Sequence, residues 1–233
     1  MNKIYRIASK SDLKHYLIAD KKALGRKSKK PRANDFIWRF QISLRHLEYY
    51  TNVKSLSPLH KIKNRIWYVR YLINSIICGF EIPINVFGKG LSIAHKGTII
   101  VNGNAKVGEN CRMHTCVNIG TAPGAFGLAP IIGNDVYIGP GAKLWGGIKI
   151  GNNVMIGANA CVGKDFPDNV CIAGTPAKII KNIGREEIEQ TNRQKEIDIN
   201  NKYEDTSSNN ITTNRRSRET YIRSMSFTKR QRS

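Results

Sequence analysis

The chain has no long apolar run and few acidic residues. The longest apolar stretch in its 233 residues, Tyr71–Phe80, is interrupted by Asn74 and Ser75 and is too short to cross a bilayer. The N-terminus, MNKIYRIASKSDLK, lacks the apolar segment of a secretory signal peptide, so we expect a cytoplasmic protein. Acidic side chains number 17 against 38 Lys and Arg, and residues 1–80 hold 18 basic and 4 acidic side chains, a net +14.

Several binding motifs are also missing. Zinc-finger spacing, an RNP-type aromatic motif and a basic heptad repeat are absent, so we expect no nucleic-acid partner despite the net charge of +21. The positive charge of residues 1–80 also suits a peripheral contact with an anionic membrane surface. Five cysteines, at 78, 111, 116, 161 and 171, form no CxxC pair and have apolar neighbours. We therefore predict buried, reduced thiols and no metal site.

Helical signals fill the first third of the chain. Ser11 is the expected N-cap of a first helix that Gly25 ends, and Asn34 is the expected N-cap of a second. A Ser-Pro pair at 57–58 opens a third helix, which Gly79 ends. These signals predict a basic, α-helical leader over residues 1–80.

From Val101 an apolar residue returns every six positions, often followed by glycine, with a small or β-branched side chain four residues later. Hexapeptide repeats of this kind are the signature of a parallel β-helix, in which three short strands and three corners make one triangular coil. Residues 89–178 provide five such coils. The repeat positions are Val101, Val107, Met113, Ile119, Ile132, Ile138, Leu144, Ile150, Ile156 and Val162.

One interruption breaks the period. Thirteen residues separate Ile119 from Ile132, so Thr121–Pro130 is expected to bulge out of the prism. The pattern stops after Lys181, and the composition beyond it is typical of disorder. We therefore predict a mainly β protein: the leader at 1–80, a parallel β-helix of about five coils at 81–181, and a polar, basic and largely disordered tail at 182–233.

Four segments of this β part resemble a known family. GFEIPINVFGKGLSIAH, IGPGAKLWGGIKIG, IGANACV and IAGTPAKII are similar to the serine O-acetyltransferase group of hexapeptide-repeat acyltransferases, closest to the branch encoded for surface-polysaccharide O-acetylation. The leader segments ADKKALG and PRANDFIWRFQISLRHLEYY resemble the helical part of that branch. The resemblance covers residues 10–181. It implies a left-handed β-helix, a homotrimer, acetyl-CoA as donor and active sites between neighbouring prisms.

His95 is the first catalytic candidate. It falls at a repeat position where the others are apolar, and it closes the segment LSIA as the catalytic histidine of the family closes a similar one. A neutral imidazole there takes the proton of an acceptor hydroxyl as that oxygen attacks a thioester, in one direct step. The alternative is a hydrogen-bonded core histidine. His114, 19 residues further on, is the second candidate, and Glu81 corresponds roughly to an aspartate of the family.

The acceptor side departs from the family pattern. Leu128-Ala129-Pro130 stands where the serine enzymes have Arg-His-Pro, and Ala94 stands where they have an aspartate before the histidine. The resemblance implies that these groups recognise serine. Their replacement favours a sugar hydroxyl of a surface polysaccharide as the acceptor. The alternative is a serine O-acetyltransferase of cysteine biosynthesis, in which His114 and Glu81 replace the lost groups.

The donor side matches the family better. The resemblance implies that small residues on successive coils admit the pantetheine arm of acetyl-CoA and that lysines after the last coil meet its phosphates. Each lysine also has the simpler interpretation of a solvated surface residue. The candidates for the arm are Pro140, Gly141, Gly157 and Ala158, and those for the phosphates are Lys178 and Lys181.

Three other functions are alternatives for a protein with this hexapeptide repeat, these histidines and a basic leader. A zinc lyase resembling the γ-class carbonic anhydrases needs three histidines, and the repeat region has two. A non-catalytic trimeric scaffold is the second, because a fold does not by itself give a function. The third is an acyltransferase whose donor is carried on an acidic acyl carrier protein, which the basic leader would attract.

Overall fold

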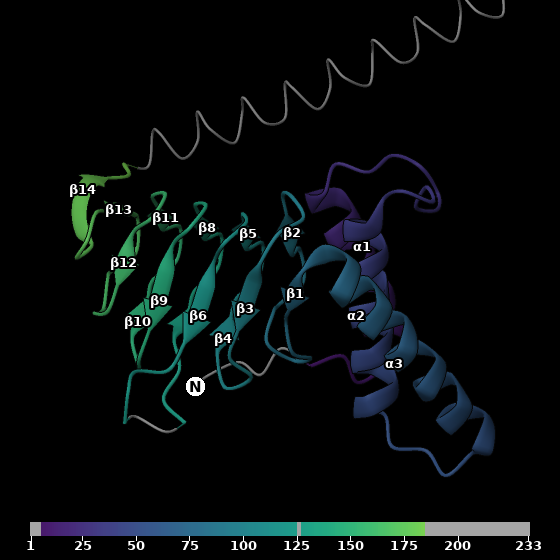
Figure 1. Ribbon diagram of the computed structural model, residues 1–233. Helices are drawn as coiled ribbons and strands as arrows, with labels where there is room; N and C mark the ends of the chain where they lie inside the picture. Colours follow the sequence, from purple (N-terminus) through teal and green to yellow (C-terminus); the bar gives the residue numbers. More distant parts are fainter. Residues whose placement is uncertain (1–5, 125–126, 185–233) are drawn as a thin grey trace, which may run out of the picture. The chain divides into compact units, whose positions relative to one another are not determined.

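The computed structural model describes residues 6–124 and 127–184 (Figure 1). Three helices come first: α1 (Lys10–Ala23), α2 (Phe36–Asn52) and α3 (Pro58–Cys78). Beyond them short strands stack in layers, from β1 beside the helices to β13 and β14 at the far end (Figure 1). Residues up to Asn182 form one compact unit. In the described part of the chain no helix is long and apolar enough to span a membrane.

Local signals set the helix ends. Gly25 and Gly79 follow α1 and α3 with left-handed φ values of 64° and 75°, as expected from the sequence. The N-caps differ by one or two residues from the predicted ones. The hydroxyl of Ser9 rather than Ser11 accepts the backbone N–H of Asp12, and Asp35 rather than Asn34 caps α2.

The strands form three sheets along the sides of a triangular prism. Sheet I has the order β1-β3-β6-β9-β12, sheet II has β10-β7-β4, and sheet III has β14-β13-β11-β8-β5-β2. All pairs are parallel except β13 with β14. The bounds are β1 (Phe80–Glu81), β2 (Ser92–Ile93), β3 (Ile99–Val101), β4 (Lys106–Val107), β5 (Arg112–Met113), β6 (Asn118–Gly120), β7 (Ile131–Ile132), β8 (Tyr137–Ile138), β9 (Lys143–Trp145), β10 (Lys149–Ile150), β11 (Met155–Ile156), β12 (Cys161–Val162), β13 (Val170–Ala173) and β14 (Lys178–Asn182).

The core of the prism is the predicted hexapeptide set. All ten repeat residues from Val101 to Val162 are at most 3% exposed, and the small or branched residues four positions later are buried with them. The left-handed β-helix preceded by helices is therefore confirmed, with five parallel strands in sheet I and five in sheet III. The first coil begins at Phe80, earlier than the predicted start at residue 89, because β1 already pairs with β3.

Corner residues hold the coils in register. Asn110, Asp135, Asn153 and Asn169 stack at one corner with φ between 53° and 59°, a left-handed conformation that Asn and Asp tolerate. The Asn110 amide donates to the Asp135 carboxylate at 2.9 Å, and Asn153 donates to Asn169 at 2.9 Å. These side-chain hydrogen bonds join one coil to the next and so keep the outward-facing residues of neighbouring coils aligned.

The prediction that all five cysteines are buried needs correction. Cys78 and Cys111 are buried, and burial raises the pKa of their thiols to about 11 and about 12, but Cys116 is exposed and Cys161 and Cys171 are half-buried. Cys116 occupies a corner, with φ 61°, and its exposed side chain lies outside the core.

The predicted disorder of the tail concerns residues outside the described ranges, and the domain boundaries at 80 and 181 stay predictions.

Candidate active site

Most of the candidate residues lie along one edge of the prism. We call this corner after sheet III the histidine edge: residues 94–98, 114–116, 139–141, 157–159 and 173–174. Successive coils align there because each position donates its backbone N–H to the next coil at 2.8 to 3.1 Å. The aligned positions are Ala94, His114, Gly139 and Gly157.

The two histidines come together at the helical end of this edge. Their ring centroids lie 5.9 Å apart and are tilted by 53°. His95 is exposed, while His114 is half-buried beneath the ring of Tyr137, whose centroid is 5.2 Å away. The structure therefore brings two of the three predicted catalytic residues together and adds Tyr137, which was not among the residues predicted from the sequence. Its outward position directly before the repeat residue Ile138 was the available signal.

His95 does not occupy the interior position predicted from the six-residue period. Ile93 is the buried residue there, and it pairs with Met113, twenty positions later rather than eighteen. The two extra residues extend the corner and carry His95 out to the surface. The interpretation of His95 as a core histidine is therefore wrong, and its imidazole is open to a ligand.

Electrostatics favour a neutral imidazole at His114. Partial burial, with the nearby charge of Arg112 and the presence of His95, lowers the pKa of His114 below its ordinary value. A neutral ring accepts a hydrogen bond through one nitrogen and donates through the other. His114 can thus orient an acceptor hydroxyl or the neighbouring His95 near neutral pH.

Glu81 lies apart from the histidines. It is exposed on β1 in sheet I, where it pairs with Ile100. No hydrogen bond or ion pair joins its carboxylate to either histidine within residues 6–124 and 127–184. Within one chain, therefore, Glu81 makes no direct polar contact with the histidine pair, and its catalytic role stays a prediction.

Small residues continue the histidine edge toward β13. A Cβ added at Gly139 would lie 2.8 Å from the Ala158 nitrogen, and one added at Gly157 would lie 2.9 Å from Ala173. Close stacking of the coils thus requires glycine at both positions, and only small side chains follow along this part of the edge. Pro140 and Ala158 are exposed along this strip, and Gly141 has a left-handed φ of 75°.

The predicted lysines lie at the end of this strip. β14 runs back along β13, and Lys178 pairs with Ala173, which directly follows the strip. Lys181 pairs with Cys171, further from the corner. Both side chains are exposed. A ligand laid along the edge would therefore meet the histidines at one end and Lys178 at the other.

Blocking the strip is expected to weaken donor binding without unfolding the prism. Ala158→Trp places a large side chain on an exposed position, so the core keeps its packing. With acetyl-CoA as the donor that the family resemblance implies, we expect its KM to rise by about tenfold or more, as for the loss of roughly 1.4 kcal/mol of binding. Ala33→Trp, at an exposed position in the leader, is the matched control. An unchanged KM in Ala158→Trp would show that the donor lies elsewhere.

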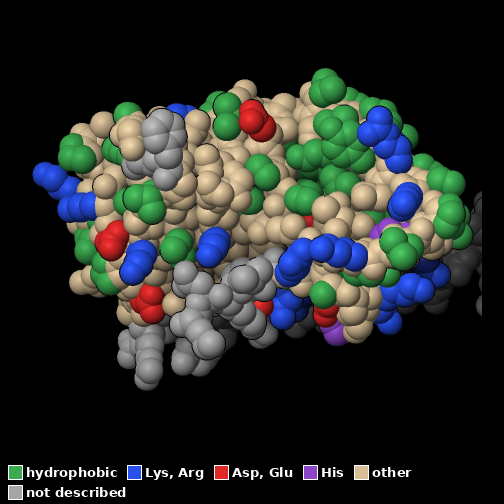
Figure 2. Space-filling view, turned by 90° about the horizontal axis from the view of Figure 1, so that it is seen from below, with side chains coloured by type: hydrophobic (Ala, Val, Ile, Leu, Met, Phe, Trp, Pro, Cys, Tyr) green, Lys and Arg blue, Asp and Glu red, His purple; other side chains and the backbone are tan. Residues whose placement is uncertain are grey.

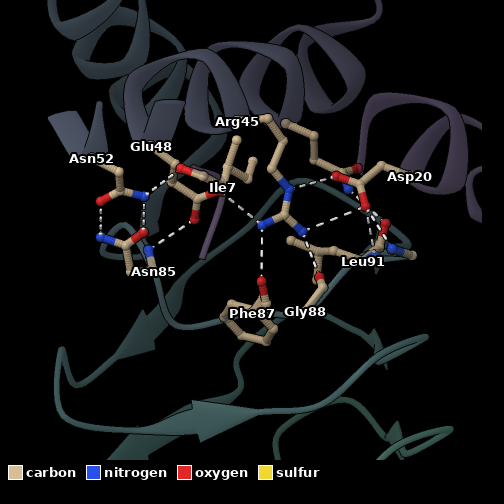
Figure 3. A network of polar contacts seen from close by, with 11 residues as sticks. Ile7, Asp20, Arg45, Glu48, Asn52, Asn85, Phe87, Gly88 and Leu91 are labelled. Atoms are coloured by element: carbon tan, nitrogen blue, oxygen red, sulfur yellow. Dashed lines mark hydrogen bonds and ion pairs between the residues drawn. The ribbon is translucent and has the colours of Figure 1, made fainter. Parts of the chain in front are cut away.

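The helices hold the strand that leads to His95 (Figure 3). Asp20 of α1 accepts the backbone N–H groups of Gly90 and Leu91 at 2.8 and 2.9 Å. Arg45 of α2 donates to Asp20 at 2.8 Å and also to the backbone carbonyls of Phe87 and Gly88, at 2.9 and 2.7 Å. The segment just before β2 is thereby fixed to two helices, and His95 follows two residues after that strand.

A second acid completes this buried network. Glu48 accepts from Arg45 at 3.0 Å and from the backbone N–H of Asn85 at 2.8 Å. Arg45, Asp20 and Glu48 are at most 2% exposed. Burial raises the pKa of both carboxyls, while the guanidinium and the backbone donors oppose that rise. Each buried charge thus has its partners, as a stable buried ion network requires.

The bulge lies at a different edge from the histidines. Residues 121–124 and 127–130 connect β6 in sheet I to β7 in sheet II. Leu128, at the position of the arginine in the family's Arg-His-Pro motif, is 58% exposed, and Ala129, at the position of the second histidine, is buried. Within one chain, therefore, this loop does not form a wall of the histidine site.

Residues 6–124 and 127–184 contain no group of three or more His, Cys, Asp or Glu side chains placed to hold a metal ion. The ligand set that the zinc-lyase alternative requires is thus not assembled in this part of the chain.

Comparisons with known proteins agree with this architecture. The family model "Bacterial transferase hexapeptide (six repeats)" matches residues 129–164. A serine acetyltransferase of Synechococcus elongatus is 33% identical over 114 residues, which are 48% of this chain and 47% of that protein. The aligned part of the chain thus spans about half the length of this relative.

Solved structures extend the likeness to the helices. The serine acetyltransferase of Brucella abortus superposes with a TM-score of 0.58 at 26% identity, covering 75% of this chain and 71% of that one. Its complex with coenzyme A gives a TM-score of 0.55 at 24% identity, covering 75% and 70%. The repeat is thus that of the hexapeptide transferases. By sequence and fold together, the chain resembles the hexapeptide-repeat serine O-acetyltransferases.

Proposed function

We propose that the protein is an acetyl-CoA-dependent O-acetyltransferase. The observation that carries this proposal is the convergence of His95 and His114 at one end of a strip of glycine and alanine, with Lys178 at the other. The strip suits the thin pantetheine arm, and Lys178 and Lys181 supply positive charge for the phosphates of coenzyme A. The relative that has been solved with coenzyme A has the same fold.

The chemistry follows from the exposed imidazole. Neutral His95 takes the proton of the acceptor hydroxyl while the hydroxyl oxygen attacks the thioester carbonyl carbon. The resulting tetrahedral intermediate collapses, the carbon–sulfur bond breaks, and the imidazolium returns the proton to the departing thiolate of coenzyme A. No acyl-enzyme forms. His114, kept neutral by its surroundings, orients the acceptor.

The proposed assembly is a homotrimer packed through the prisms. Exposed apolar side chains on the prism, Ile100 at 39% and Met155 at 47%, support association. The described residues of the bulge, 121–124 and 127–130, lie at another edge than the histidines, and a neighbouring copy would bring them to the histidines. We propose the cytoplasm as the location, since all five cysteines are free, as in a reducing compartment.

L-serine is the first acceptor we propose. The replaced residues at Ala94 and 128–130 favour a polysaccharide sugar, but the relatives support L-serine, because the similar proteins from Synechococcus elongatus and Brucella abortus are serine acetyltransferases. A sugar hydroxyl remains the second candidate on a specific observation. Half-buried Ala94 beside His95 and exposed Leu128 offer no charge to the ammonium and carboxylate of serine.

Release of free thiol from acetyl-CoA with different acceptors tests both proposals. We expect thiol release and O-acetylserine with millimolar L-serine. Acetylation only of nucleotide-sugars or oligosaccharide fragments would replace serine by the sugar acceptor. Ala94→Asp is the informative variant, since it restores a carboxylate next to His95 and should raise serine turnover whichever acceptor is native. Failure of the protein to bind either acetyl-CoA or coenzyme A would overturn the transferase proposal itself.

A further inference from the structure

The outer side of α3 is apolar. Its inward side, facing α2, carries the buried residues Asn74, Ser75 and Cys78. Residues spaced by three and four positions line the opposite side: Ile62, Ile66, Val69, Ile73 and Ile76, with exposures of 56%, 52%, 44%, 51% and 80%. A surface helix of a globular protein normally has the reverse arrangement. Hydrophobic side chains gather over this helical end of the molecule in Figure 2, with Lys and Arg among them.

Basic residues flank this apolar row. Lys61, Lys63, Arg65 and Arg70 are all exposed, and residues 58–78 contain no Asp or Glu. None of the four forms an ion pair within the described part of the chain. An amphipathic helix with an apolar face and an all-basic flank is the pattern of helices that lie in the interface of an anionic bilayer.

The basic surface continues from α3 onto α1 and α2. The Arg70 guanidinium lies 4.9 Å from the ring centroid of Trp67, and Trp67 stacks on His46 of α2 at 3.9 Å. His46 in turn lines a cavity of about 480 Å³ with an apolar floor that includes Trp38 and Ile42. No Asp or Glu lines this cavity, and five lysines do: Lys10, Lys14, Lys21, Lys29 and Lys30.

We propose that this face docks the protein on an anionic lipid bilayer. The apolar row of α3 enters the headgroup region with the helix parallel to the membrane, while the flanking cations and the lysine-lined cavity contact lipid phosphates. A second copy of the chain fits this face less well. Pairing two such helices would bring their unpaired lysines and arginines against each other, and like charges across an interface are unfavourable.

Vesicle co-sedimentation of the full 233-residue chain tests the proposal. The vesicles are phosphatidylcholine alone and phosphatidylcholine mixed with phosphatidylserine. We expect binding to the mixed vesicles only, and weaker binding as the salt concentration rises. Ile66→Glu/Val69→Glu should lower the binding constant by about tenfold or more, because it removes apolar contact and adds negative charge. Ile180→Glu, at an exposed position on β14, is the matched control.

Two double variants that each remove two positive charges separate the electrostatic from the apolar contribution to binding. Lys63→Gln/Arg70→Gln should lower the binding constant by about thirtyfold, or roughly fivefold for each cation removed. Lys106→Gln/Lys149→Gln makes the same charge change on exposed residues of sheet II and should have little effect. All variants keep the basic residues beyond 184, so a loss confined to the α3 variants identifies α3.

Two results would overturn the proposal. Equal binding by the α3 variants and the wild type would show that another part of the chain meets the lipid. A smaller oligomer for Ile66→Glu/Val69→Glu than for the wild type, by light scattering without lipid, would assign the face to a second copy. Neither result bears on acetyl transfer, because the assay uses no acetyl-CoA and α3 lies outside the histidine edge.

Discussion

Replacing His95 by alanine is expected to slow acetyl transfer by roughly a hundredfold to ten-thousandfold, the usual contribution of a general base. The side chain is exposed at a corner, so its removal leaves the prism core and the coil hydrogen bonds in place. The loss should therefore fall on kcat while acetyl-CoA binding and the melting temperature stay near those of the wild type. Initial rates of thiol release, measured at saturating donor, report the change.

His114→Ala supplies the comparison. His114 is half-buried against Tyr137 and is kept neutral by its surroundings, so we expect a smaller loss that falls on the KM of the acceptor as well as on kcat. Near-normal turnover in His95→Ala, with a large loss in His114→Ala, would exchange the two roles. Near-normal turnover in both variants would exclude this edge as the reaction site.

The prism was predictable because its sequence repeats. Each coil places the same kind of residue at the same interior position, so the period of six alone identified every buried repeat residue from Val101 to Val162. The thirteen-residue gap before Ile132 located the bulge for the same reason. A repeat of this kind can be recognised in the sequence without knowing which distant residues are in contact.

The site was less predictable because it depends on departures from the repeat. The first coil is two residues longer, and counting back from Met113 by eighteen therefore put His95 inside rather than Ile93. Glu81 was placed by analogy with the family and lies on sheet I, whereas the histidines lie at the corner after sheet III. The contact of His114 with Tyr137 joins two coils separated by the bulge, whose effect on register no local pattern reveals.

The buried network between helices and prism was missed for a different reason. Asp20, Arg45 and Gly88 are far apart in the sequence, and each alone looks like an ordinary surface residue or turn. Charged residues are rarely buried unless they are paired, so their burial became apparent only in the packed structure. The leader, residues 1–80 with a net charge of +14, thus contains both a buried structural cation, Arg45, and the exposed cations of α3.

Arg45→Met is expected to lower the free energy of unfolding by roughly 3–5 kcal/mol, because it leaves Asp20 and Glu48 buried without their cation. The same change removes the hydrogen bonds from Arg45 to the backbone carbonyls of Phe87 and Gly88. The segment before His95 is then held less firmly against α2, so kcat should fall as well. Urea unfolding followed by circular dichroism measures the stability. Arg65→Met, at an exposed position on α3, is the matched control and should change stability by less than about 0.5 kcal/mol.

The pH dependence identifies the cause of this loss. Burial raises the pKa of Asp20 and Glu48 above their unfolded values, and without Arg45 the main opposing influence is gone, so both rise further in the variant. A carboxyl whose folded-state pKa is raised destabilises the fold while it is ionised, and this penalty disappears as the pH falls through that pKa. The stability gap between Arg45→Met and the wild type should therefore narrow as the pH is lowered below neutrality. A gap that stays constant across this range would mean that lost packing, rather than two uncompensated carboxylates, accounts for the destabilisation.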